Sequence, residues 1–146
     1  MKEVGAQEAH DLLQSDPKLT YLDVRSVPEF EAGHAAGAIN IPLLHFSPGA
    51  GMSPNDDFQA VVEATLDKNA KYVIGCKTGG RSARACEVMT QMGFTDVTNM
   101  RGGFGGLTDN TGRLVEPGWS TLGLPTCAAC DENASYEALA AKAKRV

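Results

Sequence analysis

Short apolar runs alternate with segments of helical periodicity along most of the chain. The clearest apolar runs are LTYLDV at 19–24 and KYVIG at 71–75, and apolar side chains at helical spacing mark 6–15 and 82–92. Two parallel strands need a long crossover between them, and a helix provides it. The sequence therefore predicts an α/β fold with a central, mainly parallel sheet and helices on both faces.

Shorter elements complete this pattern. We expect a first strand around Val4, strands at 37–42 and 96–100, and helices at 28–33, at 55–68 and after the RGGFGG segment at 101–106. Asn55 is the expected N-cap of the helix at 55–68. The segment 43–55, which is rich in Gly, Pro and Ser, is expected to be a loop.

Length and charge narrow the classes of protein. A chain of 146 residues has the length of one domain, which we place at 1–125, followed by a short tail at 126–146. The net charge of −5 argues against nucleic acid or an anionic membrane as a partner. No apolar segment typical of a signal peptide follows Met1, and no apolar run reaches membrane-spanning length. We therefore expect a cytoplasmic protein whose four cysteines are reduced and do not form a disulfide framework.

A cysteine stands where the strand at 71–75 ends. It opens the segment CKTGGRS at 76–82, and ligands of parallel α/β folds bind beyond the carboxyl ends of the strands. Its two glycines allow a tight turn with positive φ, which would point the N–H groups of residues 77–82 at an anion. The start of the following helix adds positive charge, and so do Arg81 and Lys77.

A comparison of free energies indicates why the loop N–H groups, the helix start and a cation would all be needed to keep the cysteine ionised. Keeping a cysteine ionised at neutral pH requires about 2.7 kcal/mol, whereas a helix dipole supplies about 0.3–1 kcal/mol. Hydrogen bonds from several amides and a nearby cation make up the difference. We therefore interpret the segment as a site for an anionic sulfur, or for a longer anion attached to it. A cysteine that is merely buried at a strand end is the less favoured interpretation.

Two stretches of the chain resemble one protein family. YLDVRSVPEFEAGHAAGAINIP at 21–42 and CKTGGRS at 76–82 are similar to the signature of single-domain rhodanese-like sulfurtransferases. RGGFGGLTDNTG at 101–112 is similar to the Gly-Gly segment after the last strand of that family. The tryptophan that often follows the glycines is absent there, and Trp119 lies too far along the chain to be matched. The likeness covers about residues 3–125 and implies a three-layer rhodanese-like domain.

The resemblance implies sulfur transfer through a persulfide on Cys76. The cysteine would attack the outer sulfur of thiosulfate or a similar anionic donor, then pass that sulfur to cyanide, a thiol or a protein acceptor. Lys77 and Arg81 would orient the donor, and Thr78 would offer a hydroxyl. The loop around the persulfide would consist of Lys77, Thr78, Gly79, Gly80, Arg81 and Ser82. No cofactor, metal ion, nucleic acid or membrane is implied.

Other positions of the resemblance are interpreted as scaffold. The spacing of Asp23, Arg25 and Glu29 suits a hydrogen-bonded charge cluster at a strand-to-helix turn, which we favour over a general acid. His34 follows a glycine in a tight turn and is interpreted as a structural histidine. Cys86 is expected to be buried and inert beside the apolar stripe of its helix.

Two other functions use a cysteine of this kind. Cysteine-dependent phosphatases and arsenate reductases carry five residues between the cysteine and the arginine, whereas this chain has four. A shorter loop encloses a single sulfur better than a tetrahedral oxyanion, and no aspartate is clearly placed to protonate a leaving alkoxide. A sulfur carrier, or a redox or binding module without turnover, also needs Cys76. The sequence leaves that second alternative open.

The tail carries a Cys-x-x-Cys pair whose role the sequence leaves undecided. Cys127 and Cys130 are interpreted as a redox pair that resolves the persulfide or accepts its sulfur, as half of a metal site, or as a pair without function. None of the three histidines offers a ligand pair at metal spacing: His10, His34 and His45.

The end of the tail has helical periodicity. Tyr136 and Leu139 mark a helix that Asn133 or Ser135 would cap. An isolated helix of this length is marginal in water, so we expect it to dock on the domain.

Overall fold

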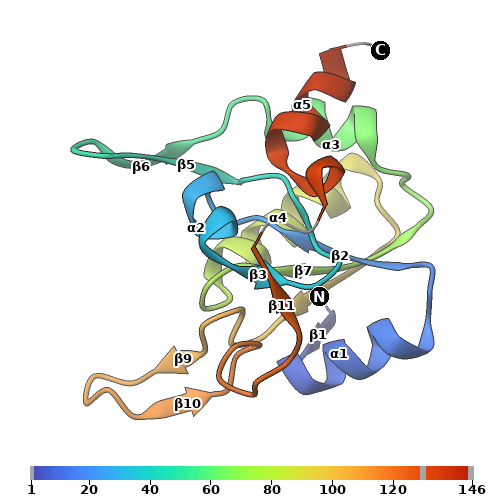
Figure 1. Ribbon diagram of the computed structural model, residues 1–146. Coiled ribbons are helices and arrows are strands. Elements are labelled where there is room, and N and C mark those ends of the chain that lie inside the picture. Colours follow the sequence, from blue (N-terminus) through green and yellow to red (C-terminus); the bar gives the residue numbers. More distant parts are fainter. Residues whose placement is uncertain (1, 129–130, 145–146) are drawn as a thin grey trace.

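A five-stranded parallel sheet forms the centre of the molecule (Figure 1). The computed structural model describes residues 2–128 and 131–144. In spatial order, the strands of the sheet are β1 (Lys2–Val4), β8 (Asp96–Met100), β7 (Lys71–Gly75), β2 (Leu19–Asp23) and β4 (Ile39–Asn40). Each neighbouring pair is parallel, as the alternation of strands and helices predicted.

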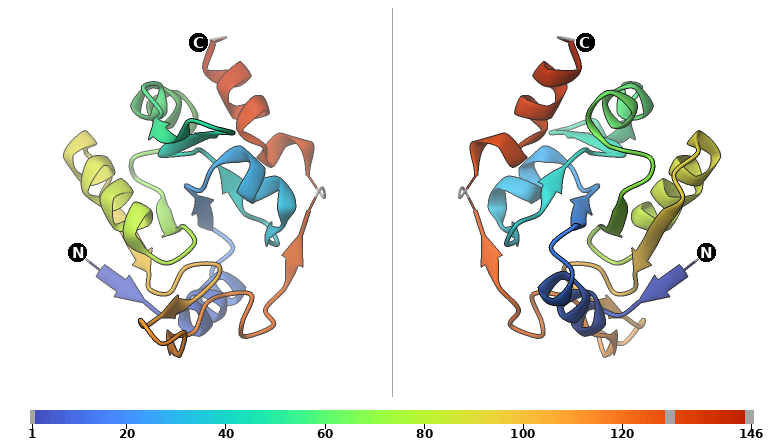
Figure 2. Two further views of the ribbon diagram at one scale, coloured as in Figure 1. Left: turned by 90° about the vertical axis from the view of Figure 1, so that its left-hand side faces the viewer. Right: turned by 90° about the vertical axis from the view of Figure 1, so that its right-hand side faces the viewer.

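Helices cover both faces of this sheet (Figure 2). The described helices are α1 (Ala6–Ser15), α2 (Val27–Ala32), α3 (Phe58–Thr65), α4 (Gly80–Met92), α5 (Tyr136–Lys144) and the short 3-10 helix η1 (Glu132–Ala134). Helices α3, α4 and α5 contribute to the apolar core on one face, and α1 contributes to the core on the other. The predicted fold class is confirmed. Among the described helices, none has the length and apolar character needed to cross a membrane.

Side chains of the central strands alternate between these two cores. Leu22 and Ile74 lie in the core formed with α3, α4 and α5, whereas Tyr21 and Val73 lie in the core formed with α1. All four are buried. Burial on both faces explains why these strands appear in the sequence as continuous apolar runs and show no alternation of apolar and polar residues.

A buried ion pair fixes the chain where β2 ends. Nε and Nη2 of Arg25 donate to the carboxylate of Asp23 at 2.9–3.1 Å, and the side chains are 5% and 1% exposed. Nη2 of Arg25 also donates to the carbonyl of Gly33 at 2.7 Å. Nδ2 of Asn40 donates to the carbonyls of Asp23 and Arg25. The guanidinium lies 4.3 Å from the ring centre of Phe104. The ion pair thereby joins β2 to the end of α2 and to the segment after β8, and the backbone of the same two residues is bonded to β4.

Two β-hairpins lie outside the central sheet. β5 (Leu44–Ser47) pairs with β6 (Gly51–Pro54), and β9 (Leu107–Thr108) pairs with β10 (Leu114–Glu116). The predicted loop at 43–55 and the predicted helix after RGGFGG are therefore wrong. The first hairpin is mostly exposed and rich in Gly, Ser and Pro. Neither of its faces is buried, so its sequence lacks the alternation of apolar and polar residues by which a strand is recognised.

Helix α3 begins later than the sequence predicted. It starts at Phe58, and Asp57 is its N-cap in place of Asn55. The buried Asn55 side chain donates from Nδ2 to the carbonyl of Pro42 at 2.9 Å and accepts at Oδ1 from the N–H of Asp57 at 3.0 Å. Asn55 therefore forms the turn that precedes the helix, and its prediction as the cap is wrong.

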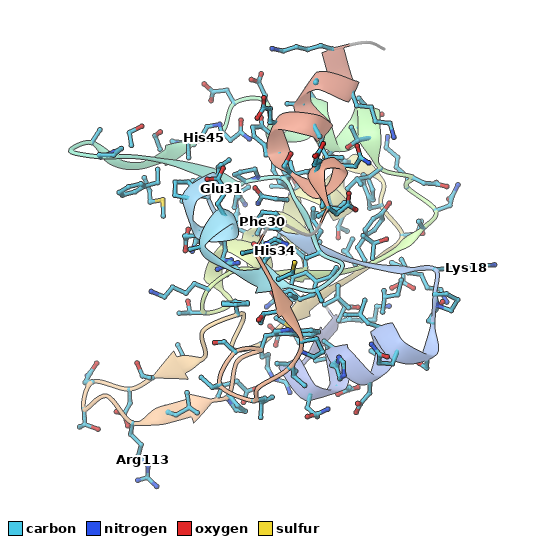
Figure 3. All side chains as sticks on the ribbon, viewed as in Figure 1. Lys18, Phe30, Glu31, His34, His45 and Arg113 are labelled. Carbon is cyan, nitrogen blue, oxygen red and sulfur yellow. The ribbon has the colours of Figure 1, made fainter. Side chains whose placement is uncertain are left out.

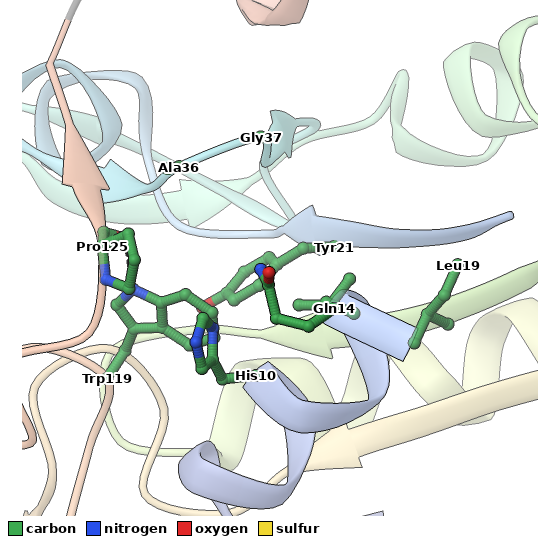
Figure 4. A pocket seen from close by; sticks show the side chains of 9 residues that line it. His10, Gln14, Leu19, Tyr21, Ala36, Gly37, Trp119 and Pro125 are labelled. Atoms are coloured by element: carbon green, nitrogen blue, oxygen red, sulfur yellow. Dashed lines mark hydrogen bonds between the residues drawn. The ribbon is translucent and has the colours of Figure 1, made fainter. Parts of the chain in front are cut away.

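Trp119 lies beside the glycine segment despite its distance along the chain. Its backbone N–H donates to the carbonyl of Gly103 at 2.9 Å. The buried indole contacts the rings of Tyr21 and His10 edge-on, and its Nε1 donates to the carbonyl of Pro125 at 2.7 Å (Figure 4). The intervening hairpin β9–β10 accounts for the long separation in sequence.

The tail is attached to the domain at two places. β11 (Thr126–Cys127) pairs antiparallel with β3 (His34–Ala35), and α5 packs against α3. Leu139 of α5 is buried, and Oγ of Ser135 accepts the N–H of Ala138 at 3.2 Å. The prediction that the tail helix docks on the domain is confirmed.

Replacing Asp23 by alanine tests the buried ion pair. This change leaves the guanidinium of Arg25 buried without its carboxylate, so we expect the free energy of unfolding to fall by about 3–5 kcal/mol. Glu63→Ala is the control, because Glu63 pairs with Lys68 on the surface and such pairs contribute less than about 1 kcal/mol. Urea denaturation followed by circular dichroism measures both variants. Similar losses in the two would show that the buried pair does not hold the fold.

Candidate active site

Cys76 follows β7 directly, at the carboxyl edge of the sheet. The N–H of Val24 donates to the carbonyl of Gly75 at 2.9 Å, so the neighbouring strand β2 holds this end of β7 in place. The Cys76 side chain is buried. Its Sγ accepts a hydrogen bond from the N–H of Gly79 at 3.0 Å and lies 3.4 Å from Oγ of Ser82.

Helix α4 begins inside the loop, at Gly80, earlier than the predicted start at 82. Gly79 precedes it with a φ of 118°, which is the positive φ expected of the glycine turn. The N–H of Ala83 makes the first helical hydrogen bond, to the carbonyl of Gly79. Within the described ranges, the N–H groups of residues 80–82 have no acceptor. One N–H of the expected cradle thus contacts the sulfur, and the open helix start beside it favours an anion.

The cysteine loop lies between the two hairpins. In the left view of Figure 2, the segment between β7 and α4 faces the viewer, with hairpin β5–β6 above it and hairpin β9–β10 below it. The side chains of Lys77 and Thr78 are exposed, and in the part of the chain that the structure describes they make no hydrogen bond or ion pair. Both are therefore available to a bound anion.

Arg81 is held differently from what the sequence predicted. Its Nη1 and Nη2 donate to the two carboxylate oxygens of Glu29 at 2.7 and 3.0 Å. Glu29 also accepts from the hydroxyl and the N–H of Ser26 at the start of α2. The expected cluster of Asp23, Arg25 and Glu29 is therefore two separate pairs, Asp23–Arg25 and Glu29–Arg81. The second pair joins α2 to the start of α4.

The pKa of Glu29 reflects this contact. Partial burial raises the pKa, but the hydrogen bonds from Arg81 and Ser26 and the charge of Arg81 outweigh that effect. The result is a pKa of about 2, against an ordinary value of 4.5. Glu29 is therefore ionised at neutral pH and neutralises much of the charge that Arg81 would otherwise offer to a donor.

The glycine segment after β8 supports the back of the cysteine loop. The N–H of Phe104 donates to the carbonyl of Cys76 at 2.7 Å, and the N–H of Gly105 donates to the carbonyl of Lys77 at 2.9 Å. A Cβ on Gly103 would overlap the carbonyl oxygen of Cys76 and lie 2.7 Å from the carbonyl carbon of Lys77. The two glycine pairs of RGGFGG were the sequence signal for this close approach, but they did not identify its partner.

His34 and Cys86 have structural surroundings. His34 is buried, stacks on the ring of Phe30 at 3.6 Å, and bonds through Nδ1 to the carbonyl of Phe30 at 2.8 Å (Figure 3). Burial raises the pKa of Cys86 to about 12, so this thiol is protonated at neutral pH. These surroundings agree with the interpretation of both residues as structural.

The tail cysteines are placed only in part. Cys127 is disulfide-bonded, contrary to the expectation that the cysteines are reduced. Cys130 lies outside the described residues, so the redox-pair hypothesis stays a prediction. Within residues 2–128 and 131–144, no group of three or more His, Cys, Asp or Glu side chains is arranged to hold a metal ion.

Known proteins are similar to this chain in sequence and fold. A family model described as a rhodanese-like domain matches residues 5–110. Thiosulfate sulfurtransferase 16, chloroplastic, of Arabidopsis thaliana is 38% identical over 123 residues, which cover 84% of this chain and 90% of the relative. Senescence-associated protein DIN1 of Raphanus sativus is 37% identical, over 73% of this chain and 57% of the relative. The crystal structure of Rv0390 from M. tuberculosis is similar with a TM-score of 0.74 and 26% identity, over 88% of this chain and 98% of that one.

A parallel sheet with a cysteine loop at its carboxyl edge defines the protein as an α/β protein of the class whose ligands bind at that edge. Within that class, the chain belongs to the rhodanese-like family of sulfurtransferases. The three-layer rhodanese-like domain expected from the sequence is confirmed.

Replacing Gly103 by alanine tests the support of the loop. The new Cβ would meet the backbone of residues 76 and 77, so the loop must move, and we expect the alkylation rate of the buried Cys76 to change by about tenfold or more. Gly112→Ala is the matched control, because Gly112 also has a positive φ, of 84°, but its Cβ would meet nothing within 4 Å. That variant should lose about 1–2 kcal/mol of stability and keep its alkylation rate. Equal rates in the two variants would contradict the supporting role.

Replacing Glu29 by glutamine tests the Glu29–Arg81 pair through pH. A carboxyl whose pKa is lower in the folded protein stabilises it above the unfolded pKa, and that stability is lost as the pH falls toward the folded value. We expect Glu29→Gln to cost about 2 kcal/mol at pH 7, which is less than the full pKa difference corresponds to because solvent screens this half-buried pair. The difference in free energy of unfolding between the variant and the wild type should shrink as the pH falls from 4.5, the ordinary pKa of Glu29, toward about 2, its pKa in the folded protein. Urea denaturation at several pH values measures it, and Glu87→Gln, which alters an exposed pair with Arg84, is the control. A difference that does not vary with pH would rule out this linkage.

Proposed function

We propose that this protein transfers sulfane sulfur from thiosulfate or a similar anionic donor through a persulfide on Cys76. The observation that carries the proposal is the position of the Cys76 sulfur. It lies 3.0 Å from the N–H of Gly79, beside a helix start whose N–H groups at 80–82 have no acceptor among the described residues. Such a place suits a sulfur that carries negative charge.

The chemistry consists of two displacements at sulfur. The Cys76 thiolate attacks the outer sulfur of thiosulfate, a new S–S bond forms, and the old S–S bond breaks with its electron pair leaving on sulfite. Cyanide or a thiolate then attacks the outer sulfur of the persulfide. The second displacement returns Cys76 as the thiolate and releases thiocyanate or a new persulfide. The negative charge of the reacting sulfur is retained in both half-reactions.

The loop residues have separate roles in this proposal. The N–H groups at the start of α4 receive the charge on the transferred sulfur. The exposed Lys77, with Thr78 beside it, attracts and orients the anionic donor. Arg81 is bound by Glu29, so it positions the loop, and its role in orienting the donor is smaller than the sequence predicted.

The acceptor and the compartment are also proposals. Cyanide, a small thiol or a protein thiol fits the second displacement. The cycle needs a reduced Cys76, and Cys76 is free although Cys127 is disulfide-bonded. We therefore propose a compartment where the Cys76 thiol stays reduced, such as the cytoplasm. The relative in A. thaliana is named as chloroplastic.

Intact mass after thiosulfate treatment tests the proposal. We expect the reduced wild type to gain one sulfur atom, which cyanide removes. Cys86→Ser should behave like the wild type, because Cys86 is a second buried thiol without a role in transfer. Cys76→Ser should gain no sulfur.

Steady-state formation of thiocyanate then distinguishes an enzyme from a carrier. An enzyme forms many equivalents of thiocyanate, whereas a carrier loads sulfur once and stops. A wild type that gains no sulfur, or a Cys76→Ser variant that does, would overturn the persulfide proposal.

A further inference from the structure

The Ser82 hydroxyl has one proton and three acceptors within reach. Its Oγ lies 2.5 Å from Oδ1 of Asn99, 3.1 Å from the carbonyl oxygen of Gly79 and 3.4 Å from Sγ of Cys76. Ser82 and Asn99 are both buried. Hydrogen bonds between oxygens are usually about 2.7 Å long. The contact with Asn99 is therefore the strongest of the three, and it takes the proton in the resting protein.

The amide of Asn99 can face Ser82 in only one orientation. Its Nδ2 lies 3.0 Å from the carboxylate of Glu3 and 3.4 Å from the carbonyl oxygen of Gly79. Both oxygens are acceptors, so the NH₂ group must face them and Oδ1 must face Ser82. Glu3 is the register partner of Asn99 in the β1–β8 pair. The sheet itself thus holds the carboxylate that orients the amide.

This orientation decides what Ser82 offers to the sulfur. With its proton directed at Asn99, the hydroxyl presents a lone pair to Cys76. A neutral thiol can donate to that lone pair, which completes a donor-to-acceptor chain from Cys76 through Ser82 and Asn99 to Glu3. A thiolate has no proton to donate. For a thiolate, Ser82 must turn its proton to the sulfur and leave two oxygens 2.5 Å apart without a proton between them.

We propose that Asn99 is a positioning residue that holds the Ser82 hydroxyl in the orientation suited to a neutral Cys76. Asn99 thereby restrains the resting sulfur from reacting with unspecific electrophiles. When the sulfur becomes charged, Ser82 turns and donates to it at the expense of the contact with Asn99. This inference deepens the proposed function, and it rests on the nucleophilic role of Cys76 proposed there.

Other charged and titratable groups also surround the sulfur. Tyr21 of β2 and Arg81 and Cys86 of α4 are near enough for their charged forms to interact with a charged Cys76. Lys77 follows it in the loop. These groups stay unchanged in Asn99→Ala, which adds no charge, so a fall of the midpoint in that variant reports the Asn99–Ser82 contact.

The pH dependence of Cys76 alkylation by iodoacetamide tests the proposal. The reagent is neutral, and peptide mass spectrometry follows modification at Cys76 alone. We expect Asn99→Ala to lower the pH midpoint of alkylation by about one unit, the effect of one added hydrogen bond to a charged group. Asn99→Asp keeps an acceptor oxygen opposite Ser82 and adds a carboxylate that also disfavours a thiolate, so its midpoint should not fall. In a Ser82→Ala background, removing Asn99 should change nothing further.

Asn55→Ala controls for a purely structural effect. Asn55 is also buried and bonds to a backbone carbonyl, so its loss should lower stability and leave the alkylation midpoint unmoved. If Asn99→Ala does not fold, Asn99→Leu fills the space without an acceptor and takes its place.

Two results would overturn the role of Asn99. One is an unchanged or raised pH midpoint of alkylation in Asn99→Ala, or in Asn99→Leu where that variant takes its place. The other is an equal fall of the midpoint when Asn99 is removed in the Ser82→Ala background. Failure of sulfur loading by thiosulfate would instead overturn the proposed function and leave the alkylation comparison intact.

Discussion

The buried pair of Asp23 and Arg25 is the interaction on which the functional edge of the sheet depends. Its guanidinium satisfies the carboxylate, binds the carbonyl of Gly33 and lies against the ring of Phe104. A buried charge without its partner costs several kcal/mol, so each of these segments is strongly held in its place. Phe104 in turn donates to the carbonyl of Cys76. The position of the cysteine loop therefore follows from an ion pair that does not touch the sulfur.

The sulfur is surrounded by parts of the chain that are far apart in sequence. The loop itself supplies the N–H of Gly79 and the open helix start, and the glycine segment after β8 supports the loop from behind. Glu29 of α2 holds Arg81 from the side. Of the two cations expected to bind the donor, one is therefore committed to the fold, and Lys77 is exposed to solvent. The site separates the positioning of the loop from the attraction of an anion.

Local patterns predicted the sheet, its helices and the cysteine loop, because strand, glycine turn and helix follow one another within a few residues. Contacts between distant segments left no such pattern. Glu29 stands near Asp23 in sequence but pairs with Arg81, 52 residues away. In the sequence, nothing distinguishes Asn99 from other strand residues, because its neighbour Glu3 is brought beside it only by the pairing of β1 with β8. The exposed hairpin at 44–54 has no buried face, so its residues are free of the alternation that identifies a strand.

The excursion between Gly105 and Trp119 is closed at its base by backbone contact. A Cβ on Gly118 would overlap the N–H of Gly106 and lie 2.8 Å from the carbonyl carbon of Gly105, so the two ends of the excursion meet. The entropy of closing a loop grows only slowly with its length. A longer or shorter excursion can therefore join the same two ends at little cost in free energy. The number of residues between the glycines and the tryptophan can consequently vary while the two still meet in space.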